Sequence, residues 1–186
     1  MPAYGTLPTI DIPPLSVHSG RDATLHPLAM MHNTSDILVR EARGTDMPGI
    51  SRVRTSVVEN LLTREQLDAR GITEASVAAS FLADSKGWVA LSGDEIVAFS
   101  IADRASASIF ALFVLPQFER RGLGSRLLDL AVDWLWANGA DLVWLTTGRD
   151  TRAAGFYERR GWVATGSMTD TGDVCYELRR PSAASS

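Results

Sequence analysis

Apolar residues along the chain fall into two patterns, short runs of strand length and longer stretches with helical spacing. The longest helical stretch begins after Gly122, and its apolar stripe consists of Leu123, Leu127, Leu130 or Ala131, and Trp134 or Leu135. A short apolar run, residues 111–115, precedes this helical stretch and is followed by Pro116, which cannot donate to a strand ladder. The pattern therefore predicts a buried strand, a basic glycine turn and a long helix, in this order.

Other apolar runs predict the strands of a sheet. They occupy residues 37–42, 87–92, 95–101, 108–115, 142–147, 163–166 and 174–178. Gly93-Asp94 separates two of these runs and predicts a hairpin, so three consecutive strands form an antiparallel meander before the long helix. A strand–helix–strand crossover normally makes a right-handed parallel pair, which we expect for the strands on either side of the long helix.

Capping residues predict three further helices. We expect them to start after Thr45 or Asp46, after Thr73, and after Asp150 or Thr151. The buried face of the first is expected to comprise Ile50, Val53, Val57 and Leu61. Residues 59–70 are interpreted as a connection between the first two of these helices.

The glycine turn has the features of an anion site. A helix N-terminus carries unpaired N–H groups and a partial positive charge, and glycines at 122 and 124 let a ligand approach the backbone closely. Arg120, Arg121 and Arg126 add cations around the same point. The turn could cradle a pyrophosphate, or it could be a plain glycine turn with solvated arginines.

Two segments resemble motifs of one enzyme family. Residues 113–126 resemble motif A of the GNAT superfamily (GCN5-related N-acetyltransferases), in which a Gln/Arg-x-x-Gly-x-Gly/Ala turn binds the pyrophosphate of acetyl-coenzyme A. Residues 150–162 are similar to motif B, Ala-x-x-Phe-Tyr-x-x-x-Gly-Phe/Trp. This chain departs from the family pattern twice, with Glu119 in place of Gln or Arg and with Asp150 where many members have Asn.

The resemblance, which covers residues 37–178, implies a fold and a cofactor. The fold is α/β of the α+β type, a mixed, mostly antiparallel six- to seven-stranded sheet with helices on both faces and splayed central parallel strands. Acetyl-CoA is implied as co-substrate, without a metal. By position in the motifs, the coenzyme-binding residues are Phe113, Val114, Arg120, Arg121, Gly122, Leu123, Gly124, Ser125 and Arg126.

Tyr157 matches the family tyrosine that donates a proton to the coenzyme A sulfur. A phenol with an ordinary pKa of about 10 stays protonated at neutral pH and can act as a general acid. The general base is open among Glu59, Asp103, Glu95 and a water chain. Cys175 is not expected to be a nucleophile, because no histidine in the folded region could activate it.

The sequence leaves two possible functions, one as an enzyme and one as a binding module without catalysis. One is an acetyl-CoA-dependent N-acetyltransferase that acts on a primary amine of a small molecule or peptide in a ternary complex. The other is an inactive acyl-CoA-binding module with a regulatory or interaction role. The acceptor is not indicated by the sequence, and the resemblance allows a homodimer.

Composition and charge limit the partners and the cellular compartment that we expect for this protein. The net charge of −4 argues against a nucleic-acid partner. A single cysteine excludes an intrachain disulfide, and no apolar run reaches the length of a membrane span, so we expect a cytoplasmic protein without a membrane partner. Residues 1–35, rich in proline and holding all three histidines at no zinc spacing, are expected to be a flexible extension. Residues 36–180 are then the N-acetyltransferase domain, and 181–186 a tail.

Overall fold

The computed structural model describes residues 37–56, 64–81, 83–169 and 172–181. They belong to one compact unit, residues 34–186. The expected extension over 1–35 and nearly all of the expected tail lie outside the described residues.

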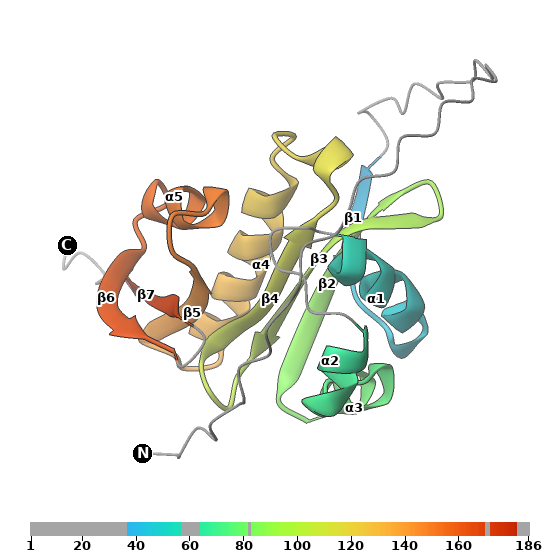
Figure 1. Ribbon diagram of the computed structural model, residues 1–186, viewed down its shortest axis with the longest axis horizontal. Coiled ribbons are helices and arrows are strands. Elements are labelled where there is room, and N and C mark those ends of the chain that lie inside the picture. Colours follow the sequence, from blue (N-terminus) through green and yellow to red (C-terminus); the bar gives the residue numbers. More distant parts are fainter. Residues whose placement is uncertain (1–36, 57–63, 82, 170–171, 182–186) are drawn as a thin grey trace, which may run out of the picture. The chain divides into compact units, whose positions relative to one another are not determined.

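A seven-stranded mixed sheet forms the centre of this unit, in the order β1-β2-β3-β4-β5-β7-β6 (Figure 1). Every neighbouring pair is antiparallel except β4 and β5, which are parallel. The predicted fold class, the meander and the parallel pairing of the strands on either side of the long helix are therefore confirmed. The strands are β1 (Ile37–Glu41), β2 (Ser85–Ser92), β3 (Glu95–Asp103), β4 (Ser108–Val114), β5 (Leu142–Gly148), β6 (Val163–Met168) and β7 (Asp173–Arg179).

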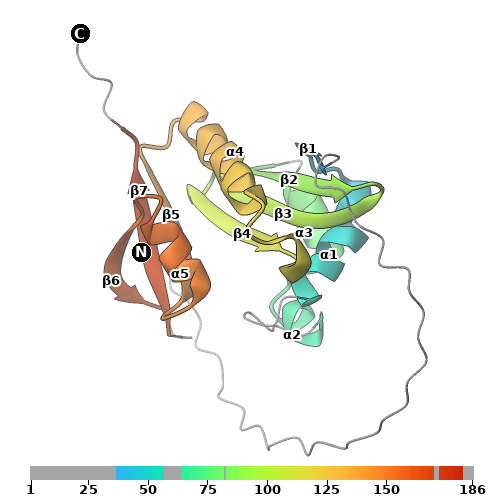
Figure 2. The same cartoon turned by 90° about the horizontal axis from the view of Figure 1, so that it is seen from above.

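Helices cover both faces of the sheet. Figure 2 shows α4 on one face of strands β2 to β4, with α1, α2 and α3 on the opposite face. α5 packs beside β5 and β6. The helices are α1 (Met47–Ser56), α2 (Arg64–Ala69), α3 (Glu74–Ser80), α4 (Leu123–Ala137) and α5 (Arg152–Glu158), with short 3₁₀ turns at Gly44–Asp46 and Pro116–Phe118.

Helix starts and stops follow the local signals in the sequence. The Thr73 hydroxyl accepts the N–H of Ser76 at 3.1 Å, and the Thr151 hydroxyl accepts that of Ala154 at 3.1 Å. α4 ends before Gly139, which has a positive φ of 93°, a conformation that glycine adopts at little cost. Thr151, and not Asp150, is thus the cap of α5.

One prediction of local structure was wrong. Residues 64–69, expected to be part of a connection, form helix α2. The segment consists largely of good helix formers, and its one leucine, Leu67, is buried and packs against the rest of the domain. The charged residues around Leu67 made the segment look like a surface connection. Residues 57–63 lie outside the described part of the chain.

The sheet opens between its two parallel strands. Within β4 and β5, only Ser108 and Trp144 are paired. The register of β4 against β3 shifts between Ile109 and Ala111, so Phe110 is an extra residue in a bulge. Figure 2 shows β5, β6 and β7 turning away from β1 to β4 beyond this point. The parting of β4 and β5 brings the end of β4 and the start of α4 to the edge of the opening.

The two faces of β3 and β4 carry different contacts. On the face of α4, the buried Ser100 hydroxyl donates to the carbonyl of Leu127 at 3.1 Å. On the face of α1, the rings of Phe99 and Phe113 stack with centroids 5.5 Å apart. These contacts fix α4 behind β4 and leave Phe113 facing α1.

Candidate active site

The glycine turn forms an open helix N-terminus. Gly122 is the N-cap of α4 and has a φ of 79°, in the left-handed region that favours glycine. The first bond of the helix runs from the N–H of Arg126 to the carbonyl of Gly122 at 3.0 Å. Within the described residues, the amides of residues 122 to 125 have no acceptor. Four donors at the positive end of a 15-residue helix suit an anion.

The three arginines of the turn lie in different places. Arg120 is exposed and has a positive φ of 57°. The guanidinium of Arg121 lies over the ring of Phe118, with 5.0 Å from Cζ to the ring centroid. Arg126 is exposed on the first turn of α4. All three add positive charge to the surface around the amides.

Glu119, the first departure from the family pattern, is paired with a cation from the other side of the opening. Its carboxylate accepts hydrogen bonds from the Arg152 guanidinium at 2.9 and 3.5 Å. Arg152 is the first residue of α5. The pair compensates the charge that a carboxylate would otherwise place beside the turn.

Gly124 lies between the end of β4 and helix α5. A β-carbon at this position would lie 3.7 Å from Cγ2 of Val114 and 3.8 Å from Cζ of Phe156. Val114 is the last residue of β4, and Phe156 belongs to α5. The first turn of α4 therefore lies close to elements on both sides of the opening.

Tyr157 is buried in an aromatic cluster. Its ring lies 5.2 to 6.3 Å from the ring centroids of Phe156, Trp162 and Tyr176. Its hydroxyl has no hydrogen-bond partner within the described residues, and burial raises the pKa of the phenol well above its usual value. Trp162 is buried, whereas Phe156 is only half-buried, so Tyr157 takes the more central place.

The remaining candidates for chemistry lie apart from one another. Asp103 and Glu95 stand at opposite ends of β3: the first accepts from Ala105 and Ser106 in its own turn, and the second pairs with Arg52 at 3.2 Å. Glu59 is outside the described residues. Cys175 is half-buried, and burial raises the pKa of its thiol, which disfavours a thiolate.

Asp150, the second departure, adopts a positive φ of 59° just before α5. It lines a polar hollow of about 550 Å³ with Arg149, Glu158 and Tyr176, and the Tyr176 hydroxyl donates to Glu158 at 3.1 Å. Neither Tyr157 nor the glycine turn lines this hollow.

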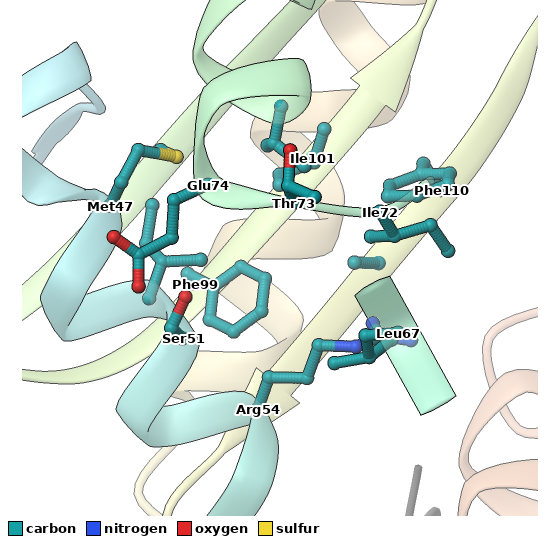
Figure 3. Close-up of a pocket in the computed structure, with 13 residues that line it drawn as sticks. Met47, Ser51, Arg54, Leu67, Ile72, Thr73, Glu74, Phe99, Ile101 and Phe110 are labelled. Carbon is teal, nitrogen blue, oxygen red and sulfur yellow. The ribbon is translucent and has the colours of Figure 1, made fainter. Parts of the chain in front are cut away.

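A second pocket contains a residue that the sequence analysis did not single out. It lies between α1, α3 and strands β3 and β4, and Arg54 of α1 lines it together with Phe99, Phe110 and Leu67 (Figure 3). The signal was present in the sequence: Met47, Ile50 and Arg54 are spaced three and four residues apart, so an arginine occupies the apolar stripe of α1.

The described residues contain no group of three or more His, Cys, Asp or Glu side chains that could hold a metal ion. Among the helices described here, none has the length and hydropathy of a membrane-spanning segment.

Comparison with known proteins identifies the family. The model of the acetyltransferase (GNAT) family matches residues 56–162, more than half of the 186-residue chain. The chain therefore belongs to the GNAT acetyltransferase family.

Two curated relatives match shorter segments. Mycothiol acetyltransferase of Beutenbergia cavernae is 41% identical over 64 residues, 34% of this chain and 22% of that protein. An uncharacterized N-acetyltransferase of Bacillus subtilis, YhfO, is 39% identical over 71 residues, 38% of this chain and 44% of that protein. The matches thus span less than half the length of either relative.

Solved structures agree with the fold over most of the chain. PaiA N-acetyltransferase of Thermoplasma acidophilum, in complex with coenzyme A, has a TM-score of 0.66 at 15% identity and covers 78% of this chain and 99% of its own. The ribosomal-protein-S18-alanine N-acetyltransferase of Escherichia coli has a TM-score of 0.61 at 19% identity, over 81% of this chain and 97% of its own. At these identities the likeness establishes the fold alone.

Proposed function

We propose that this protein transfers the acetyl group of acetyl-CoA to a primary amine of a small molecule or peptide, by direct attack in a ternary complex. The observation that carries the proposal is the set of unpaired amides at residues 122 to 125, beside the point where β4 and β5 part. Membership of the GNAT family and the likeness to a protein that holds coenzyme A support it.

The residues present fit a pyrophosphate at the glycine turn. The amides of residues 122 to 125 would donate to its oxygens, with Arg120, Arg121 and Arg126 around them. The main chain at Phe113 and Val114 would line the thioester arm, since β5 does not pair with this part of β4. Acetyl-CoA supplies an activated acyl group with a thiolate leaving group.

Alignment is the main catalytic contribution in this proposal. Holding an amine and a thioester in attack geometry removes much of the entropic part of the barrier. A main-chain amide near Phe113 or Val114 would stabilise the developing oxyanion. As the amine nitrogen bonds to the acetyl carbon and the C–S bond breaks, Tyr157, kept protonated by its burial, would give its phenolic proton to the departing thiolate. The proton that the amine loses would return to the phenolate through water, which restores Tyr157. We place this chemistry in the cytoplasm.

The test is to incubate the full chain with acetyl-CoA and a panel of amines while thiol release is followed, with acetyl-CoA binding measured separately by calorimetry. Amine-dependent thiol release supports the transferase. Binding without release on any acceptor would instead support the acyl-CoA-binding module, and the absence of binding would contradict both.

A further inference from the structure

The pocket between α1, α3 and the meander strands lies on the face of the sheet opposite α4. Its volume is about 40 Å³, and apart from Arg54 its walls are largely apolar. A space of this size holds a carboxylate-sized group or a few water molecules, but not a whole amino acid. It suits an anchoring point for one end of a molecule.

Arg54 is a partly buried cation that stacks on an aromatic ring but forms no ion pair in the described part of the chain. Its Nε is enclosed and has no hydrogen-bond acceptor, and it forms no ion pair there. Burial, with the charge of nearby Arg70, lowers the pKa of the Arg54 guanidinium from its usual value. Arg52, two residues earlier in α1, contrasts with it: that side chain pairs with Glu95 and donates to the carbonyl of Ile96 at 3.1 Å. Enclosed polar groups normally have partners, so an unpaired one calls for an explanation, and a bound anion would supply one for Arg54.

The position of Arg54 connects this pocket to the proposed transfer site. Its Cζ lies 5.0 Å from the centroid of the Phe113 ring. A guanidinium stacked on a ring keeps the N–H donors at its edge available. Phe113 belongs to the part of β4 that would line the thioester, so a ligand held by Arg54 would lie beside that strand.

The chemistry of the pocket favours a carboxylate. A guanidinium matches the planar carboxylate with two parallel hydrogen bonds. A phosphate dianion would need more donors than this small apolar space offers. Glu74 also lines the pocket, but Figure 3 shows its carboxylate at the end near Met47 and Ser51, whereas the Arg54 guanidinium lies near Leu67.

We propose that Arg54 binds a carboxylate of the acceptor, so that the substrate is an amine that also carries a free carboxyl group, such as an amino acid or a short peptide. This inference rests on the proposed transferase function. It adds the class of acceptor and the residue that selects it.

The test measures binding, so that it does not depend on turnover. The full chain, saturated with coenzyme A, is titrated with amino acids and dipeptides, each compared with its C-terminal amide. At least one acid should bind about tenfold or more tightly than its amide, the difference expected for a charge-assisted pair. Arg54→Met should abolish this preference, Arg54→Lys should retain part of it, and Arg52→Met, the matched control in the same helix, should keep it.

Equal binding of acid and amide by the wild-type chain, failure of every acid to bind, or a preference that survives in Arg54→Met would each overturn the inference. Failure of the transferase proposal is recognised separately, by the absence of coenzyme binding or of thiol release. In that case the same titrations on the coenzyme-free chain decide the role of Arg54. Melting curves of both methionine variants establish that they are folded.

Discussion

Glu119 and Arg152 form a two-point ion pair that joins the turn before α4 to the first residue of α5, with N–O distances of 2.9 and 3.5 Å. Because Arg152 is 67% exposed, the pair contributes little to stability. Its consequence is electrostatic. A carboxylate beside a proposed pyrophosphate site is partly neutralised, and the two elements on either side of the opening are linked.

Replacing Glu119 with glutamine should strengthen coenzyme A binding. The substitution removes a negative charge near the turn and leaves Arg152 uncompensated by that carboxylate. We expect an affinity gain of about 3- to 10-fold at low salt that shrinks as ionic strength rises. Calorimetric titration at two salt concentrations measures it, with Glu95→Gln as the control for loss of an exposed, paired carboxylate. Weaker binding by Glu119→Gln would show that the ion pair itself organises the site.

Gly124 provides a test of the turn with a matched pair of substitutions. The site accepts a β-carbon at ordinary contact distance from Val114 and Phe156, so Gly124→Ala should fold and bind coenzyme A almost normally. Gly124→Glu places further bulk and a negative charge among the unpaired amides. Its coenzyme affinity should fall by about tenfold or more, while its melting temperature stays close to that of Gly124→Ala. Equal coenzyme affinity in the two variants would place the pyrophosphate elsewhere.

Tyr157→Phe should lower kcat by about 100-fold and leave coenzyme affinity nearly unchanged, since it removes only the proton donor. Burial raises the pKa of Tyr157, so the phenol stays protonated up to pH values above its usual 10. The ratio of wild-type to variant kcat should therefore be constant between about pH 6 and 9. Tyr176→Phe, in the same aromatic cluster, is the control. Lost coenzyme affinity with kcat preserved would contradict the role as acid.

A partly buried ion pair near the start of α1 should make stability depend on pH. Arg40 donates to both carboxylate oxygens of Asp46 at 2.7 and 2.9 Å, and the Arg43 amide donates to one of them at 2.7 Å. The Arg40 bonds are the main reason that the pKa of Asp46 is lowered. A lowered pKa in the folded state stabilises the fold at pH values above the unfolded pKa of about 3.9, and the gain is lost as the pH falls through the folded value.

Asp46→Asn should accordingly lower the unfolding free energy by about 2 kcal/mol at pH 7. The gap from wild type should narrow only as the pH falls below about 3.9. Denaturant unfolding across this range measures it. Asp84→Asn, which disrupts an exposed pair with Arg104, should cost much less. A gap that stays constant down to pH 2 would mean that the charge of Asp46 is not what stabilises the turn.

Local signals in the sequence predicted most of the fold because their causes are local. The threonine caps at Thr73 and Thr151 and the left-handed glycine at Gly122 each fix the start of a helix through residues only a few positions away. A run of apolar residues predicts a strand in the same local way. Helix α2 was missed because its attachment depends on one buried residue, Leu67, in a charged segment.

The contacts that define the site depend on tertiary structure and could not be predicted in the same way. Glu119 and Arg152 are 33 residues apart and meet across the opening between β4 and β5. The greater burial of Tyr157 over Phe156 depends on how a seven-residue helix is rotated, which so short a pattern leaves undetermined. Arg54 becomes enclosed only when residues from α2 and α3 line the same pocket.

Arg54 should destabilise the protein in the absence of ligand. The effect of replacing it on stability therefore distinguishes a ligand-binding role from a structural one. A half-buried guanidinium without an acceptor loses hydration and gains only its stacking on Phe113 in return. Methionine is long and unbranched, and its thioether packs well against aromatic rings. Arg54→Met should therefore raise the unfolding free energy by about 1 kcal/mol, or roughly 2–4 °C in melting temperature. Arg52→Met, which loses an ion pair and a hydrogen bond to Ile96, should not be stabilised.

A fall in melting temperature for Arg54→Met would mean that the arginine holds α1 against β4 by stacking. Stabilisation together with lost carboxylate binding would mean that the unpaired cation serves the ligand at the expense of the fold.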